Sequence, residues 1–135
     1  MALTIKLEIV TPKGIVYSDD VEMVTLRSAE GQIGILPHHV PLMTRLVPGE
    51  LMVRKGGRDQ YLAMGGGLVE VTKHRISILS DMAIAMESID EAAVEEARQR
   101  AAARLRDKIS KEEVATVNAS LARSLAQLKV KRRHH

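Results

Sequence analysis

Residues 76–94 read ISILSDMAIAMESIDEAAV, and within this stretch a strand pattern gives way to a helical one. The apolar run from Ile76 to Leu79 is typical of a short β-strand. After Glu87 neither Gly nor Pro occurs through residue 135, so the residues that most often interrupt helices are missing there. The stretch therefore predicts two domains, a β domain at residues 1–87 and a helical domain at residues 88–135.

The first of these domains has the periodicity of strands. Leu3, Ile5, Leu7 and Ile9 alternate with polar residues, as in a strand with one buried and one wet face. Residues 11–14, Thr-Pro-Lys-Gly, suit a tight turn and predict a first hairpin that continues into the apolar residues 15–17. Six further apolar runs are typical of strands: Val21 to Arg27, Gln32 to Leu36, Leu51 to Arg54, Gln60 to Met64, Leu68 to Val71, and Ile76 to Leu79.

Turn residues separate these runs at Asp19-Asp20, Glu30-Gly31, Pro48-Gly49 and Lys55-Gly56-Gly57-Arg58. The short spacing leaves no room for helical crossovers, which excludes a parallel α/β sheet and predicts an all-β sandwich of about ten short strands. Gly65-Gly66-Gly67 is followed by a strand and by no Lys-Ser or Lys-Thr, so it does not match a phosphate-binding loop. A backbone bend or a close approach of two strands is expected there instead.

Two helix starts are predicted in the second domain. Ser88-Ile89-Asp90-Glu91 has the form of a capping box, with Ser88 as the N-cap, and Ser110-Lys111-Glu112-Glu113 repeats it. The chain must therefore break between them, and a short connection makes two helices antiparallel neighbours, a helical hairpin. The facing apolar seams are expected to be Val94, Ala97, Ala101 and Leu105 in the first helix, and Val114, Val117, Leu121, Leu125 and Leu128 in the second.

The first seam is rich in alanine, and this bears on how firmly the hairpin is held. Each Ala side chain buries little area, and burial contributes roughly 25 cal/mol per Å². We therefore expect weak packing within the hairpin. Our hypothesis is that this element opens or detaches from the sandwich at modest cost, as the parts of switches do.

Composition and charge exclude several classes of protein. The chain has 135 residues and no Cys, which excludes disulfides, thiolate zinc sites and thiol nucleophiles. No apolar stretch approaches the roughly 20 residues of a spanning helix. Residues 1–87 carry nine Lys or Arg and ten Asp or Glu, whereas residues 88–135 carry eleven and seven. The positive charge thus belongs to the helical domain, where it complements the helix dipoles or faces an acidic partner.

The histidines and carboxylates do not form a recognisable catalytic or metal-binding motif. His38 and His39 are adjacent, but no Asp, Glu or Cys stands at ligand spacing near them, so a structural role is favoured and no metal is expected. His134 and His135 have the character of tag remnants and are set aside. No Ser-His-Asp order or paired-carboxylate motif emerges, so we expect no catalytic residues and no enzyme.

Four segments, taken in order, resemble the epsilon subunit of the F-type ATP synthase found in bacteria and chloroplasts. Residues 30–42, EGQIGILPHHVPL, are similar to the family's EGxxGILPxHxPL stretch. Residues 66–71, GGLVEV, resemble its GGxxEV strand, and residues 78–83, ILSDMA, resemble the end of its sandwich. Residues 121–128, LARSLAQL, are similar to its second helix. The order and spacing of the four make the resemblance specific.

The resemblance implies a non-catalytic subunit of the central stalk. Such a subunit binds the gamma subunit, rests on the c-ring and turns with the rotor, coupling proton flow to ATP synthesis. It would be peripheral on the cytoplasmic face of the bacterial plasma membrane, held there only through the complex. The family's loop at the membrane end, which faces the c-ring and gamma, corresponds here to Glu30, Gly31, Gln32, Ile33, Gly34 and His39. Gln32 occupies a position that is often acidic in the family.

For the helical hairpin, the resemblance implies inhibition of ATP hydrolysis when the hairpin extends toward the catalytic beta subunits. The basic residues expected to contact those subunits are Arg98, Arg104, Arg106 and Arg123. Some bacterial members bind ATP between the helices and the sandwich, which would involve Asp90, Arg100 and Arg123 here. Ala93 replaces that motif's arginine, Val94 its alanine, and Gln127 another arginine of those members. ATP binding is therefore expected to be weak or absent, and no cofactor is expected.

Two alternative functions belong to different classes. A basic-tailed module that binds nucleic acid would use the charge of residues 88–135, but with only Tyr17 and Tyr61 the chain lacks a base-stacking surface. A free-standing sandwich with enzymatic activity would need convergent polar groups that the sequence does not reveal. We expect no nucleic acid among the partners.

Overall fold

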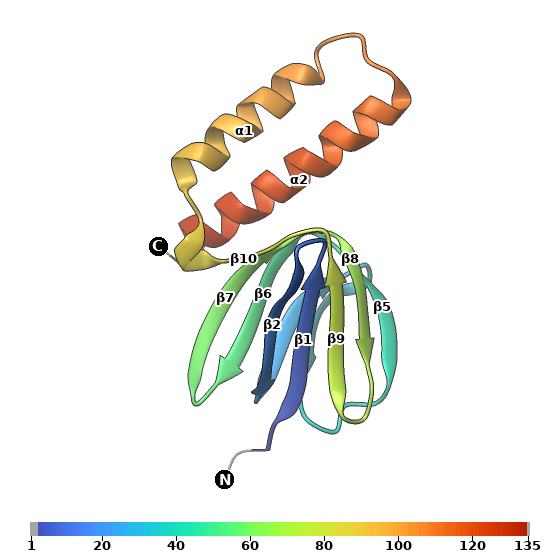
Figure 1. Ribbon diagram of the computed structural model, residues 1–135, viewed down its shortest axis with the longest axis vertical. Helices are drawn as coiled ribbons and strands as arrows, with labels where there is room; N and C mark the ends of the chain where they lie inside the picture. Colours follow the sequence, from blue (N-terminus) through green and yellow to red (C-terminus); the bar gives the residue numbers. More distant parts are fainter. Residues whose placement is uncertain (1–2, 135) are drawn as a thin grey trace.

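The computed structural model describes residues 3–134, as ten strands followed by two long helices (Figure 1). The strands are β1 (Ile5–Thr11), β2 (Gly14–Val21), β3 (Met23–Ser28), β4 (Gly31–Ile35), β5 (Leu42–Leu46), β6 (Gly49–Lys55), β7 (Arg58–Met64), β8 (Gly67–Val71), β9 (Arg75–Ser80) and β10 (Ala83–Ala85). A short 3₁₀ turn, η1 (Met86–Ser88), leads into α1 (Glu91–Arg104) and α2 (Lys111–Arg133). The predicted fold class, a β-sandwich followed by a helical hairpin, is confirmed.

The strands form one folded sheet in the order β10-β7-β6-β3-β5-β8-β9-β1-β2, with β4 added beside β3. Neighbours are antiparallel except β1 and β9, which run parallel with Leu7 opposite Ile76. Successive strands are joined by tight hairpins where the sequence supplies Gly. At the β6–β7 turn, Gly56 and Gly57 both have positive φ, 60° and 73°, the geometry that two-residue hairpins favour.

Three details of the strand prediction were wrong. The pair Asp19-Asp20 is not a turn: both residues lie in β2, opposite Leu7 and Lys6. These carboxylates are tolerated because β2 is an edge strand, and Asp19 pairs with Lys55 of β6. Strands β5 and β10 were missed, because β5 follows directly after Pro41 and β10 is only three residues long.

The interior of the sandwich is aliphatic and follows the predicted alternation. Ile5, Leu7 and Ile9 of β1 are 4%, 0% and 0% exposed, and the residues between them are partly exposed. They pack with inward-facing side chains of the other strands in one cluster that also contains Val24, Leu26, Ile35, Leu46, Leu51, Val53, Val69, Val71, Ile76 and Ile78.

The three consecutive glycines allow two backbone segments to approach closely, as predicted. A Cβ atom on Gly67 would stand 1.7 Å from the carbonyl oxygen of Leu79, and one on Gly65 would stand 1.6 Å from Oδ1 of Asp81. The contact at Gly67 is with backbone and leaves no room for a side chain, whereas the Asp81 carboxylate beside Gly65 belongs to a flexible side chain that can move. The β8–β9 pair therefore needs glycine where β8 begins.

The two helices start at different caps than the sequence suggested. Ser88 belongs to η1, and the N-cap of α1 is Asp90, whose carboxylate accepts a hydrogen bond from the Ala93 amide at 3.1 Å. The predicted capping box at Ser88 is therefore wrong, because the chain needs η1 to leave the sheet before the helix begins. The cap of α2 is Ser110 as predicted, with its hydroxyl accepting from the Glu113 amide at 3.2 Å.

The helices lie side by side beyond one end of the sandwich, with α2 nearer to the sheet (Figure 1). This placement changes the predicted seam of α2. Leu128 is buried, but Leu125 is 49% exposed, so its assignment to the seam was wrong. The C-terminal half of α2 packs on both α1 and the sandwich, and its buried residues are Ser124, Ala126, Leu128 and Val130. Within α1, Ala101 is the one buried residue, at 9% exposed.

We expect Gly67→Ala to destabilise the sandwich by about 2 kcal/mol or more, because the new methyl group must displace the backbone of β9. Urea unfolding monitored by circular dichroism measures this. Gly34→Ala is the matched control: the nearest atom to its Cβ would be Thr25 Cγ2 at 3.9 Å, so its free energy of unfolding should change by less than about 0.5 kcal/mol. Equal effects of the two substitutions would contradict the close-approach interpretation.

Candidate functional site

The junction between the hairpin and the sandwich is small and mixed in character. Its buried residues are Ala63 of β7, Ile89 before α1 and Val130 of α2. Partly buried apolar side chains surround them, namely Tyr61, Met82, Ile84, Met86 and Val94. Compared with the core of the sandwich, this cluster offers little apolar area, so polar contacts must contribute much of the specificity of docking.

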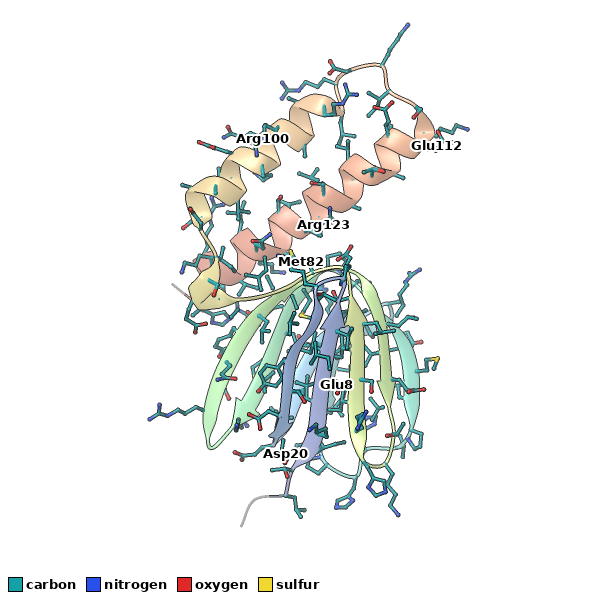
Figure 2. The ribbon with its side chains drawn as sticks, viewed as in Figure 1. Glu8, Asp20, Met82, Arg100, Glu112 and Arg123 are labelled. Atoms are coloured by element: carbon teal, nitrogen blue, oxygen red, sulfur yellow. The ribbon has the colours of Figure 1, made fainter. Side chains whose placement is uncertain are left out.

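Polar side chains of α2 reach the β9–β10 connection and the segment that joins the sheet to the helices. Arg123 Nη1 lies 3.2 Å from Asp81 Oδ2, and Lys131 donates to the Met86 carbonyl at 3.3 Å. Figure 2 shows Arg123 on α2 above Met82 at the end of the sandwich. Arg123, one of the predicted contacts to beta subunits, is therefore engaged by the sandwich in this position of the hairpin.

The end of α2 contacts the sandwich at a second place. His134 Nε2 contacts Glu50 Oε1 of β6, and the imidazole ring stacks on Tyr61 with centroids 3.6 Å apart. The sequence analysis excluded His134 as a tag remnant, so it did not predict the contact of His134 with Glu50 and Tyr61. His135 lies outside the described residues.

The other predicted basic residues lie on the hairpin and mostly pair with neighbouring carboxylates. Arg98 bonds Glu95 at 2.6 Å, and this hydrogen bond lowers the pKa of Glu95 below its usual value. Arg104 joins the two helices through Glu113 at 2.7 Å. Arg106 follows α1 and is exposed. The Arg104–Glu113 pair is exposed and the Arg98–Glu95 pair is about a third exposed, so both lie at the surface and hold their arginines only weakly.

The three residues considered for nucleotide binding do not converge. Asp90 is occupied as the helix cap, and Arg123 faces Asp81 on the sandwich. Arg100 lines a groove of about 390 Å³ between the helices, together with Arg104, Thr116 and Ser120. Neither Asp90 nor Arg123 lines that groove.

The predicted ring-facing residues are divided between the two ends of the sandwich. Glu30 lies in the β3–β4 turn, and Gly31, Gln32, Ile33 and Gly34 follow in β4. Gln32 lines a small cavity with Lys129 and Arg133 of α2, so this turn lies at the hairpin end.

His39 does not lie beside Glu30, because the five residues of β4 separate the two. At roughly 3.3 Å per residue this strand alone separates His39 from the turn by about 17 Å. Its Nδ1 lies 2.6 Å from the Val40 carbonyl oxygen in the β4–β5 loop. The single site of six residues must therefore be corrected to a turn and a separate histidine.

An exposed apolar face crosses the outside of several neighbouring strands and was missed by sequence reasoning. Ile15 of β2 lies opposite Val10 of β1, Val10 opposite Leu79 of β9, and Leu79 opposite Leu68 of β8. Ile15, Leu79 and Leu68 are 64%, 54% and 52% exposed. Met43 of β5, 67% exposed, lines a groove of about 260 Å³ with the last two. We call these five residues the outer apolar face.

The signal for this face was present in the sequence. Adjacent apolar pairs such as Leu68-Val69 and Ile78-Leu79 place one side chain inside the sandwich and the other outside. Soluble proteins rarely leave such a contiguous patch open unless it binds something.

The described residues contain neither a cluster suited to a metal ion nor a membrane-spanning helix. Among residues 3–134, His, Asp and Glu side chains do not gather in groups of three or more that could hold a metal ion. In the same range, neither helix has the length and apolar character required to cross a bilayer.

Comparison with known families identifies both halves of the chain. Residues 4–86 match the model described as ATP synthase, Delta/Epsilon chain, beta-sandwich domain, and residues 87–132 match its long alpha-helix domain. The chain belongs to the delta/epsilon chain family of ATP synthase. The resemblance drawn from the four sequence segments is thereby confirmed.

Relatives in this delta/epsilon family match over nearly their whole length. The ATP synthase epsilon chain of Herpetosiphon aurantiacus is 43% identical, covering 95% of this chain and 94% of the relative. The ATP synthase epsilon chain of Chloroflexus aggregans is 42% identical, covering 98% of this chain and 95% of the relative.

Solved structures support the fold. A chain in the mitochondrial ATP synthase of Euglena gracilis aligns with a TM-score of 0.74, 24% identity and coverage of 97% of this chain and 82% of that one. A second, from the central stalk and c-ring of Tetrahymena thermophila ATP synthase, aligns with a TM-score of 0.65, 16% identity and coverage of 96% and 98%.

We expect Asp90→Ala to loosen the first turn of α1, because it removes the acceptor of the Ala93 amide, at a cost of about 1 kcal/mol. Amide hydrogen exchange over residues 91–95 measures this. Asp90→Asn should retain most of the protection, since an amide oxygen can also cap. Ser88→Ala should leave exchange unchanged. If exchange became faster in Ser88→Ala but not in Asp90→Ala, Ser88 would be the N-cap, as the sequence predicted.

Proposed function

We propose that this chain is the non-catalytic epsilon subunit in the central stalk of a bacterial F-type ATP synthase. In this role the sandwich anchors the chain to the rotor, and the hairpin restrains ATP hydrolysis. The observation that carries the proposal is the outer apolar face on a sandwich whose inward-facing apolar residues already fill a closed core. The names of the relatives, ATP synthase epsilon chain, and the central-stalk assembly of a structural neighbour support it.

The outer apolar face is the proposed contact with the gamma subunit. Most of its side chains are exposed, and a neighbouring groove of about 360 Å³ continues from Leu68 and Leu79 to Val10, Pro12 and Gly66 at the hairpin end of the sheet. Burial of such a face against another subunit would favour association, and the part of that gain that exceeds the entropy lost on binding would appear as affinity. Rotation as one body requires a contact of this strength.

The β3–β4 turn with the start of β4, Glu30 to Gly34, is the proposed contact with the c-ring. Gly31 has φ of 119°, so the turn has a geometry that a side chain would strain. Because Gln32 is uncharged, this contact would depend on hydrogen bonds and shape and not on opposite charges. Through it the chain would be peripheral at the cytoplasmic face of the plasma membrane.

The hairpin is the proposed regulatory part. In the docked position Arg123 pairs with Asp81, so it can contact an acidic beta-subunit surface only after the hairpin leaves the sandwich. Arg98 and Arg104 would exchange their surface partners for acidic residues of the beta subunits, and exposed Arg106 would add to them. Several weak pairs acting together are sufficient to shift a near-balanced equilibrium.

ATP is not the proposed ligand that holds the hairpin down. Ala93 offers no cation to a phosphate, Asp90 caps α1, and Arg123 and Arg100 face different surroundings. Docking therefore depends on contacts within the chain. Titration of the isolated chain with ATP in a calorimeter should give no heat of binding at micromolar ligand.

Leu68→Asp combined with Leu79→Asp should reduce co-purification with the gamma subunit at least tenfold, because two charges would be buried in an apolar contact. Pull-down of gamma with the tagged chain measures this. Leu125→Asp is the control, since Leu125 is 49% exposed but lies on the hairpin. Loss of gamma in the control and its retention in the double variant would contradict the assigned face.

Deletion of residues 88–135 should leave assembly intact and raise ATP hydrolysis by at least about fivefold, the range of ordinary allosteric coupling. Steady-state hydrolysis by the reconstituted enzyme measures this, with subunit stoichiometry as the control for assembly. Unchanged hydrolysis in a fully assembled enzyme would rule out the regulatory half of the proposal.

A further inference from the structure

Glu50 of β6 is the carboxylate around which positive side chains collect at the hairpin end of the sandwich. Arg133 Nη1 lies 3.5 Å from its Oε2, and His134 Nε2 contacts its Oε1. Lys129 and Arg27 line the same cavity of about 30 Å³. The carboxylate thus faces cations from the strand beside it and from the end of α2.

This carboxylate is well shielded from solvent. The side chain of Glu50 is 17% exposed and that of His134 is 18% exposed, although Arg133 is 63% exposed, whereas most ion pairs of the hairpin have both partners about a third to three quarters exposed. Shielding strengthens the attraction between opposite charges and makes loss of one partner more costly.

Tyr61 of β7 completes the arrangement. Its ring stacks on the imidazole of His134 with an interplanar angle of 13°, so it fixes the plane in which His134 meets Glu50. One turn earlier, Val130 is 0% exposed against Ala63 of the same strand. Apolar, stacking and charged contacts therefore follow one another along the last turn of α2.

We propose that Glu50 and Tyr61 form a clasp for residues 130–134, and that this clasp decides whether the hairpin is docked. Its partner is a segment of the same chain. Without the clasp the hairpin keeps the small cluster at Ile89 and Val130, the Lys131–Met86 hydrogen bond and the exposed Arg123–Asp81 pair. Glu50 and Tyr61 are positioning residues, and the consequence for hydrolysis rests on the proposed function.

The basic end of α2 also has two roles that do not involve the sandwich. Cations in the last turn complement the helix dipole whatever lies opposite, so that role does not require Glu50. Arg132, whose pKa is raised by its hydrogen bond to Glu91, ties α2 to α1 and holds the hairpin together without the sandwich. Of these three roles, only the clasp couples the end of α2 to β6.

The test is amide hydrogen exchange of the isolated full-length chain, which reports even rare undocking. Glu50→Gln keeps the shape of the side chain and removes its charge, and we expect exchange over residues 124–133 to become about tenfold faster. Exchange over residues 5–80 should not change. Glu8→Gln on β1, a carboxylate away from the helices, is the matched control (Figure 2).

A double substitution separates the clasp from the dipole effect. Arg133→Gln should accelerate exchange on its own but add little in the Glu50→Gln background, because both act through one contact. Additive effects would overturn the proposal, as would Glu50→Gln behaving like Glu8→Gln. If Glu50→Gln disturbs the sandwich, His134→Gln provides the same comparison, because His134 lies beyond the end of α2 and outside the sheet. A His134→Gln variant with unchanged exchange would equally overturn the clasp.

The assembled enzyme distinguishes this inference from the proposed function. When both hold, Glu50→Gln lowers ATP hydrolysis, since more hairpins are released. Faster exchange in the isolated chain with unchanged hydrolysis would confirm the clasp and reject the inhibitory role. Unchanged exchange, with hydrolysis still raised by deletion of residues 88–135, would reject the clasp alone.

Discussion

Val130 of α2 packs against Ala63 of β7 and Ile89 of the connecting segment. This contact joins the hairpin to the sandwich, and each of these two parts is otherwise stabilised by its own internal contacts. The sandwich has its own aliphatic core, and the helices are linked to each other by the Arg104–Glu113 and Arg132–Glu91 pairs. Among the described residues this junction has a cluster of only three buried side chains, so on our proposal the polar contacts at its edges bias the hairpin toward the docked position. Weak packing within the hairpin stays a prediction from the alanines of α1, and the small junction between the parts is a separate observation.

The sandwich was the most predictable part of the molecule. Alternation in residues 3–9 and the glycine-containing turns reflect local constraints, namely the two-residue period of a strand and the positive φ of tight hairpins. Strand β5 and the true course of β2 depend on neighbouring strands instead. In the sequence, Asp19 and Asp20 resemble a turn. Only the folded sheet shows that they lie in the edge strand β2 and that Asp19 pairs with Lys55.

The helical part shows the same division. Ser110 caps α2 as its capping box indicated, but Asp90 replaces Ser88 because a 3₁₀ turn is needed between sheet and helix. The seam of α2 was correct at Leu128 and wrong at Leu125, because helical periodicity identifies a face only when one surface packs on the helix. At the candidate site, the sequence singled out Arg123 but not its partner Asp81. The outer apolar face, the Glu50 contact and the separation of His39 from Glu30 all arise from register and topology.

The parallel pairing of β1 with β9 has a consequence for biosynthesis. Strand β1 leaves the ribosome before the other strands, yet it sits in the finished sheet between β2 and β9, and its parallel neighbour comes about seventy residues later. Such long-range pairing closes slowly, so the sandwich cannot be completed until Ser80 has emerged. The helices are translated after the strands and fold from local contacts. They therefore reach a finished surface, and the order of synthesis itself favours the docked form in a newly made subunit.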